Sequence, residues 1–339
     1  MHARMRVRMH VLAPITAVIT AIMLLAASGC GGALGGTSSA ASGGPEQTTL
    51  NVAVVPAVDS AGFFVALHDG LFRKHGLIIN YTPATSSDTV INQQVAGKYD
   101  ITGGNYVSYI QHYVRDHQQL QIISEGSVMQ QGSQAIYTLP SSRIKDLAML
   151  KGHLLGINAE HNINYLLAAS VLTENGVNLG TVQFPAQPIP FPTMAAQLAA
   201  GKIAAAAMPE PFATSAEQKY GAVKLADLDQ GATENFPIQG YVATRAWVRS
   251  HPNTVKAFVA ALEAGQQIAD TSRPSVEKAM ESLAGPMDGQ VPAIVAAVMA
   301  LNSYPIGIDR VRLQRVPDVM RQFGLLPSRF DIAQMLGSP

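Results

Sequence analysis

The sequence predicts an α/β protein made of two lobes of similar build. A helix, a Gly-Lys stop, a short strand and a polar loop follow one another at Val90–Tyr106 and again at Met194–Phe212. Glycine adopts the left-handed conformation that ends a helix, and a lysine suits the negative end of the helix dipole. Strands also alternate with helices along most of the chain, which indicates a mostly parallel sheet in each lobe. Any α/β protein can reuse this arrangement, so the repeat alone does not establish two lobes.

The first part of the body alternates strands with helices, and turn residues separate them. Strands are expected to end at prolines or polar loops, and helices to begin after Ser, Thr or Asp. The expected strands are Leu50–Val55, Ile78–Thr82, Tyr99–Thr102 and Leu120–Ser124. The expected helices are Phe63–Asp69, Thr89–Ala96 and Val107–Arg115. The segments between them include a loop at Gly103–Asn105 and a polar connector at Glu125–Gly132.

The middle part continues this alternation. Its expected strands are Gln134–Thr138, Leu154–Ile157, Val182–Phe184, Ile203–Met208 and Ala222–Leu225. Its expected helices are Ile144–Lys151, Asn164–Glu174, Met194–Ala200 and Phe212–Tyr220. The strand Ile203–Met208 is uncharged and apolar, as a fully buried strand is. Two prolines around Glu210 break this strand and leave Glu210 at its tip.

The last part of the chain is almost entirely helical after one further strand at Tyr241–Thr244. The expected helices are Asn253–Asp270, Pro274–Ser282, Val291–Ala300 and Arg310–Phe323. No later strand is available for them to cover, so we expect this tail to pack back on the first lobe.

Composition and charge exclude some classes of function. The 339 residues are 47% hydrophobic and 14% charged, which indicates a globular protein large enough for two domains. Without the three arginines of the leader, 20 of the 23 basic residues remain against 23 acidic residues, a net charge of −3. No basic stripe is present, so we expect no nucleic-acid partner.

The N-terminus has the pattern of an export signal. Arg4, Arg6 and Arg8 precede the uncharged segment Val11–Ala27, and small residues follow it. This apolar segment of 17 residues is at the short limit for a membrane span, so a permanent signal anchor is the alternative.

Cys30 distinguishes between these two interpretations. It is the only cysteine in the chain, so it forms no intramolecular disulfide. The segment LLAASGC, Leu24–Cys30, resembles a bacterial lipobox, although Ala27 stands where leucine is preferred. The resemblance implies that residues 1–29 are a lipoprotein signal peptide and that Cys30 carries lipid. Residues 30–47 then form a flexible Gly/Ser/Ala tether, which holds the protein on the extracytoplasmic face of the cell membrane.

Three motifs in order resemble the substrate-binding proteins of nitrate/sulfonate/taurine and thiamine-precursor ABC importers. They are FFVALHDGLFRKHGL at Phe63–Leu77, LAAGKIAAAAMPEPF at Leu198–Phe212 and WVRSHPNTVKAF at Trp247–Phe258. Ala204 stands where the family usually has aspartate, although Asp100 keeps that residue in the first copy. The resemblance implies a type II periplasmic-binding-protein fold. Lobe 1 would combine residues 48–133 with 236–339, which include the helical tail, and lobe 2 would be residues 134–235.

The resemblance also implies a function. The two lobes would close on a small polar solute, sulfonate-, nitrate- or taurine-like or else aminopyrimidine-like, and deliver it to an ABC permease and its ATPase. We expect a monomer without cofactor or metal and without enzymatic activity. The sequence contains no metalloprotease, nucleophile-elbow or phosphate-loop motif. The alternatives are an exported enzyme of the pyrimidine- or menaquinone-biosynthesis branch of this fold, and a solute-binding sensor module.

Four loops and the tip of the central strand supply the candidate ligand-binding residues. These are Asp59, Phe63, Phe64, Ser86, Ser87, Asn105, Tyr106, His161, Asn162, Asn164, Tyr165 and Glu210. Aromatic rings can stack on a flat ligand, and hydroxyl or amide groups at helix starts can bind polar groups.

Each candidate also has a structural alternative. One of the two phenylalanines can be a core residue, and the serines can simply cap a helix. Glu210 can pair with an amine or lock the lobes together. If the Ser86–Ser87 loop binds an anion, Asp88 must point away from it. No arginine falls in these loops, so a sulfonate or nitrate would depend on backbone N–H, hydroxyl and amide donors. Glu210 and Asp59, together with several aromatic rings, favour a cationic or aromatic ligand slightly.

Overall fold

The computed structural model describes residues 43–283 and 290–337. The expected signal peptide, Cys30 and most of the tether therefore lie outside the described residues. Among the helices of residues 43–283 and 290–337, none combines the length and the apolar character needed to cross a bilayer.

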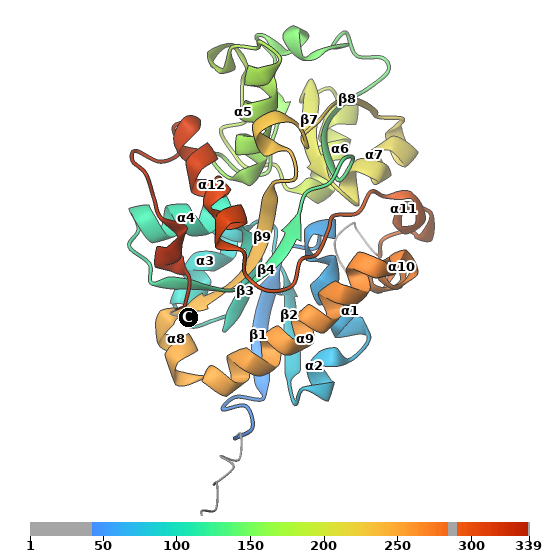
Figure 1. Ribbon diagram of the computed structural model, residues 1–339. Coiled ribbons are helices and arrows are strands. Elements are labelled where there is room, and N and C mark those ends of the chain that lie inside the picture. Colours follow the sequence, from blue (N-terminus) through green and yellow to red (C-terminus); the bar gives the residue numbers. More distant parts are fainter. Residues whose placement is uncertain (1–42, 284–289, 338–339) are drawn as a thin grey trace, which may run out of the picture. The chain divides into compact units, whose positions relative to one another are not determined.

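The first sheet has five strands in the order β2-β1-β3-β9-β4 (Figure 1). They are β1 (Thr49–Val54), β2 (Ile78–Pro83), β3 (Ile101–Asn105), β4 (Leu120–Val128) and β9 (Pro237–Thr244). Strand β1 pairs in parallel with β2 and β3, whereas β9 runs antiparallel to β3 and β4. Four strands therefore share one direction, and β9 is reversed.

The second sheet has four strands in the order β6-β7-β5-β8. They are β5 (Gln134–Thr138), β6 (Leu155–Gly156), β7 (Ala205–Pro209) and β8 (Val223–Asp227). Strands β6 and β7 are parallel, and β5 runs antiparallel to β7 and β8. Each sheet thus has one reversed strand, β9 in the first and β5 in the second. The chain reaches each of them by crossing from the other sheet, from β8 to β9 and from β4 to β5. The predicted fold class, two mostly parallel sheets flanked by helices, is confirmed.

The helices cover these sheets. In the first part of the chain they are α1 (Ala61–His68), α2 (Leu71–Lys74), α3 (Ser87–Val95) and α4 (Tyr106–Arg115). Those of the middle part are α5 (Ile163–Glu174), α6 (Phe191–Ala199) and α7 (Phe212–Tyr220). The last part contains α8 (Arg245–Ser250), α9 (Pro252–Thr271), α10 (Arg273–Glu281), α11 (Ala293–Val298) and α12 (Arg310–Gln322). Helices α9 and α10 pack on α1, and α12 packs on α4, so the tail returns to the first sheet (Figure 1).

Helices α1 and α9 cross at two glycines. A Cβ atom on Gly265 would come 2.4 Å from the backbone oxygen of Gly62, and one on Gly62 would come 2.6 Å from Cγ of Gln266. Beside this crossing, the ring of Phe258 stacks on Phe72 with their centroids 5.2 Å apart. The small residues therefore let α9 approach α1 closely enough to share its core.

A buried ion pair holds α12 to the first sheet. The Glu125 side chain in β4 is only 1% exposed and accepts hydrogen bonds from Nε and Nη2 of Arg312, at 2.9 and 3.1 Å. The backbone N–H of Asp309 donates to the same carboxylate. Burial opposes the charge on Arg312, but the Glu125 carboxylate outweighs it and raises the Arg312 pKa.

Two segments predicted as connections belong to strands. Gly103–Asn105 lies in β3, because Gly103 pairs with Tyr241 of the reversed strand β9 and its lack of a side chain makes room for that ring. Strand β4 extends into the expected connector Glu125–Gly132 as far as Val128, and its pairing with β9 has an irregular register. Both predictions were wrong because the partner strand lies far away in the sequence.

Two segments that were predicted as a strand and a helix do not form these elements in the structure. Val182–Phe184 is not a strand and contributes only an isolated bridge, between Leu154 and Gln183. Ile144–Lys151 is not an α-helix and contains only a short 3-10 turn, Leu147–Leu150, which Asp146 caps.

Candidate functional site

A cavity of about 30 Å³ lies between elements of the two sheets. Its lining residues come from η1 (Val58–Ser60), β3, β5, β7 and β9, from the starts of α3, α5 and α6, and from the segments just after β1 and before α5. They are Val55, Asp59, Ser87, Gly104, Asn105, Gln134, Asn158, Ile163, Asn164, Phe191, Pro209, Ile238 and Gln239. This volume is on the scale of one or two water molecules. The wall is therefore closely packed, and its lining mixes polar with apolar residues.

On the side of the first sheet, Ser87 and Asn105 support each other. Ser87 Oγ accepts hydrogen bonds from the backbone N–H and from Nδ2 of Asn105, both at 2.9 Å. Asn105 Oδ1 in turn caps α4 by accepting from the N–H of Ser108 at 2.9 Å. A Cβ atom on Gly104 would come 2.3 Å from Ser87 Oγ, so only glycine leaves this pair undisturbed.

On the side of the second sheet, three asparagines hold the start of α5. Asn162 Oδ1 caps the helix by accepting from the N–H groups of Asn164 and Tyr165, and Asn162 Nδ2 donates to Asn158 Oδ1. Asn164 Oδ1 accepts from the N–H of Asn158 at 3.3 Å. This contact fixes the orientation of the Asn164 amide and leaves its Nδ2 without a hydrogen-bond partner in the described part of the chain.

Asp59 is the one charged side chain among the described lining residues. Its Oδ1 accepts from Asn302 Nδ2 at 2.7 Å and from Gln134 Nε2, across the two sheets, at 3.4 Å. Burial raises the pKa of Asp59 to about 6, and the hydrogen bonds from Asn302 and Gln134 limit the rise. The carboxyl is therefore poised to take up or release a proton in mildly acidic solution.

Glu210 does not line this cavity. It is 3% exposed, and its carboxylate accepts from the N–H and Oγ1 of Thr214, at 3.0 and 2.7 Å, at the start of α7. Its backbone oxygen accepts from the N–H of Val58, which joins the two sheets beside Asp59. Burial raises the Glu210 pKa to about 7, against the hydrogen bonds from Thr214.

We expect Glu210→Gln to flatten the pH dependence of stability between pH 6 and 7. The folded chain holds the Glu210 proton up to about pH 7, whereas the unfolded chain loses it near 4.5. The free energy of unfolding therefore falls as pH rises through this range, and the variant lacks this decrease. Urea unfolding at several pH values measures it, with exposed Glu160→Gln as the control. A slope in the Glu210→Gln variant equal to that of the wild type contradicts the assignment.

The other predicted site residues lie away from the cavity. Phe63 and Phe64 are fully buried in the core, where their rings make an edge-to-face pair with centroids 5.5 Å apart. Tyr106 is buried against Gly240. Two of the remaining residues are helix caps and two lie near the surface: Ser86 caps α3, Asn162 caps α5, and His161 and Tyr165 pack edge to face. The structure thus brings Asp59, Ser87, Asn105 and Asn164 together in one wall.

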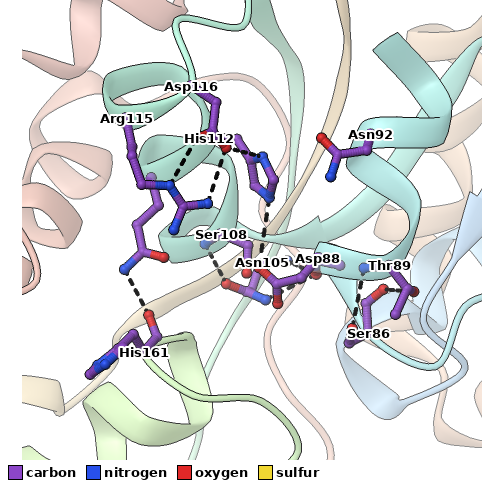
Figure 2. A network of polar contacts seen from close by, with 12 residues as sticks. Ser86, Asp88, Thr89, Asn92, Asn105, Ser108, His112, Arg115, Asp116 and His161 are labelled. Atoms are coloured by element: carbon purple, nitrogen blue, oxygen red, sulfur yellow. Dashed lines mark hydrogen bonds and ion pairs between the residues drawn. The ribbon is translucent and has the colours of Figure 1, made fainter. Parts of the chain in front are cut away.

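A polar network supports this wall from behind, as Figure 2 shows. His112 of α4 lies between Asp116, at 2.8 Å, and Asp88 of α3, at 3.9 Å. Asp88 therefore points toward α4 and not into the cavity, and burial raises its pKa. On the other side of α4, Gln111 Nε2 donates to the backbone oxygen of His161 at 2.8 Å. The network ties the start of α3 and the loop before α5 to the second half of α4.

Nine lining residues were not among the predicted site residues: Val55, Gly104, Gln134, Asn158, Ile163, Phe191, Pro209, Ile238 and Gln239. Gln134 and Gln239 lie on the reversed strands β5 and β9. Asn158 begins the loop before α5. This loop was itself predicted to reach the site, so its position was the signal by which Asn158 could have been predicted. Phe191 opens α6 and stacks on Phe212 with centroids 5.5 Å apart.

Comparison with known proteins agrees with this architecture. The alkanesulfonate-binding protein SsuA from Xanthomonas axonopodis pv. citri aligns with a TM-score of 0.70 and 17% identity, over 86% of this chain and 99% of that one. The periplasmic nitrate-binding protein NrtA from Synechocystis PCC 6803 aligns with a TM-score of 0.69 and 16% identity, over 85% of each chain. A search of curated protein sequences found no significant match. At such identities the solved structures establish the fold, which is the two-lobed periplasmic-binding-protein fold.

The family is established by a separate comparison. The sequence model described as NMT1/THI5 like matches residues 57–272, more than half of the chain. The chain therefore belongs to the NMT1/THI5-like family, and the resemblance carried by its three motifs is confirmed.

Proposed function

We propose that this protein is an extracytoplasmic solute-binding lipoprotein that captures a small polar solute between two lobes and delivers it to an ABC permease. The observation that carries the proposal is the cavity itself. It lies between the two sheets, and a buried amide nitrogen, Asn164 Nδ2, has no partner there within the described residues. Unpaired buried donors are costly in a folded protein unless a ligand uses them.

Motion of the lobes follows from the size of the cavity. A space of about 30 Å³ is far smaller than the roughly 300 Å³ of a small-molecule pocket. Capture of a solute therefore requires the lobes to separate and close again by hinge bending. We assign residues 48–133 and 236–339 to lobe 1 and residues 134–235 to lobe 2, with the hinges in the two crossings between the sheets.

The fold and family support this role. The solved structures with this fold include an alkanesulfonate-binding protein, a nitrate-binding protein and a ligand-binding component of an ABC-type import system. The lipobox-like segment ending at Cys30 supports anchoring at the outer face of the cell membrane. We infer a monomer whose partners are the solute, the permease and its ATPase.

A thermal-shift screen of the full chain in mild detergent tests the proposal. A solute that binds only the folded form raises the unfolding midpoint in a concentration-dependent way. Sulfonates, nitrate, taurine, amides and aminopyrimidines are the compounds to screen. The proposal fails if the folded protein responds to none of them. Palmitate labelling that requires Cys30 tests the anchor separately.

We expect Gly104→Ala to weaken solute binding by about tenfold or more. The added methyl group collides with Ser87 Oγ and disturbs the Ser87–Asn105 pair that shapes the wall. A misplaced polar group in a closed site costs about as much as a lost hydrogen bond. Calorimetric titration of the best solute measures the effect. Gly180→Ala is the control, because it is exposed and its Cβ would meet only ordinary contacts; equal affinities in all three chains would contradict the prediction.

An enzyme is the second candidate, because a carboxyl with a raised pKa in a cavity is typical of catalytic sites. Asp59 meets that description. Incubating the protein with each solute that binds, followed by mass spectrometry, distinguishes the two functions. Recovery of the unchanged solute supports binding, and a product that Asp59→Asn abolishes supports catalysis.

A further inference from the structure

Side-chain oxygens cap three of the helix starts around the cavity, whereas α6, whose start also lines it, follows Pro190 without a side-chain cap. Asn105 Oδ1 caps α4, Ser86 Oγ caps α3, and Asn162 Oδ1 caps α5. Free N–H groups at a helix start are what make it an anion-binding site. Here a side-chain oxygen accepts from one or two of these N–H groups at each of the three helices, which reduces what their starts offer an oxyanion.

The cavity also lacks a cation. Among its described lining residues none is Lys, Arg or His, and five are amides: Asn105, Gln134, Asn158, Asn164 and Gln239. Amides can bind a neutral polar group through both donors and acceptors. An anion here would gain no ion pair and would face the Asp59 carboxylate across a small, poorly hydrated space, where like charges repel strongly.

Two donors remain for a ligand. Asn164 is 1% exposed and Gln239 is 2% exposed, and in the described part of the chain neither Asn164 Nδ2 nor Gln239 Nε2 has a hydrogen-bond partner of good geometry. Gln239 Oε1 accepts from Ser60 Oγ at 2.9 Å, which sets the orientation of this amide. Gln239 also lies close enough to Tyr241 for a side-chain hydrogen bond that limits the rise in the Tyr241 pKa, so the Tyr241 hydroxyl competes with a ligand for Gln239 Nε2. Asn164 stands at the start of α5 and Gln239 in β9, and both line the cavity, so a ligand there can accept from both side chains.

One acceptor also remains. Both hydrogen bonds to Asp59 reach Oδ1, and Oδ2 receives none within residues 43–283 and 290–337. The titratable groups that interact with Asp59 are Tyr241 and Tyr304, and burial raises the pKa of both, so they stay neutral. Glu210 lies nearby through its backbone contact with Val58. None of these groups neutralises the Asp59 carboxylate.

We propose, on the basis of the solute-binding function above, that Asp59 determines the charge class of the solute by accepting a hydrogen bond from a ligand N–H group. Asn164 and Gln239 donate to an acceptor atom of the same ligand. The solute is therefore a small neutral or cationic compound that carries an N–H donor beside a carbonyl-, sulfonyl- or ring-nitrogen-type acceptor. Free oxyanions are rejected.

Isosteric pairs of probes test this class. Urea and nitrate share a planar four-atom shape, and methanesulfonamide and methanesulfonate share a tetrahedral one; cytosine adds a larger N–H-bearing probe. Calorimetric titration and thermal shift of the full chain in detergent give the affinities. We expect each neutral member to bind at least about tenfold more tightly than its anionic partner, the scale of one charge-assisted hydrogen bond.

The Asp59→Asn variant identifies the residue responsible. It should weaken binding of urea, methanesulfonamide or cytosine by about tenfold or more and reduce the discrimination against anions. Asp69→Asn, at an exposed position beside α1, should change neither. In the wild type, affinity for a neutral probe should fall as pH is lowered from about 7.5 to about 5, because a protonated Asp59 can no longer accept the bond through a charged oxygen. The Glu210→Gln variant should show the same fall in affinity as pH is lowered.

The outcomes separate this inference from the function on which it rests. A wild-type chain that binds nitrate or methanesulfonate at least as tightly as urea or methanesulfonamide overturns the inference and leaves solute capture intact. Binding of the neutral probes that Asp59→Asn leaves unchanged also overturns it. If a folded wild type and a folded Asp59→Asn chain bind none of the probes, the result contradicts the solute class, and the wider screen then decides the proposed function.

Discussion

Replacing Arg312 by methionine should lower the free energy of unfolding by about 3 kcal/mol. The change leaves the Glu125 carboxylate, which is 1% exposed, without the two hydrogen bonds that neutralise it. A buried charge that loses its partner costs far more than the pair itself contributes, because the charge cannot be rehydrated in place. Urea unfolding followed by circular dichroism measures the difference.

The matching control is Arg310→Met on the same helix. Arg310 pairs with Asp331, but both side chains are more than half exposed, so water replaces the partner when it is lost. This change should cost less than about 1 kcal/mol. The interpretation of the Glu125–Arg312 pair is wrong if the two variants lose equal stability.

Gly265→Val should destabilise the protein by about 3 kcal/mol, at the upper end of the range for overpacked cores. A Cβ atom there would lie 2.4 Å from the backbone oxygen of Gly62 and 2.6 Å from Cβ of Ala66. Residues Ala61–Ala66 of α1 are all buried, so the helix has no room to retreat. The free energy of unfolding, again from urea titration, gives the size of the effect.

Gln267→Val provides the control, because it places the same side chain two positions along α9 at an exposed site. Its cost should stay within about 0.5 kcal/mol, as is usual for surface changes. If Gly265→Val lowers the free energy of unfolding no more than Gln267→Val does, α9 can move away from α1 and their close approach is not required.

The fold was largely predictable because its elements carry local signals. The uncharged run Ile203–Met208 contains most of the fully buried strand β7, which extends from Ala205 through Pro209, and the stop at Gly201 follows the end of α6. Strand pairing carries no such signal. The reversed strand β9 pairs with β3, which lies far away in the sequence, so Gly103–Asn105 read locally as a loop although it is the end of a strand.

The candidate site was predictable only to the level of its loops. Asn162 and Asn164 occupy the same predicted loop, yet Asn162 caps α5 and Asn164 faces the cavity. Two residues at a helix start differ in direction by more than half a turn, and the sequence does not say where a cap falls. Phe63 and Phe64 show the same problem, because both rings are core residues.

The first sheet is built from segments far apart in the sequence, and this has a consequence for how the chain folds during synthesis. All strands of the second sheet are available once Asp227 has been synthesised, whereas the first sheet lacks the strand between β3 and β4 until Thr244. Helix α9, which covers α1, ends only at Thr271. Contacts between such distant segments form slowly because long loops must close first. A nascent chain that has just passed Asp227 thus holds one complete sheet and one incomplete sheet, and the binding wall that both contribute is assembled last.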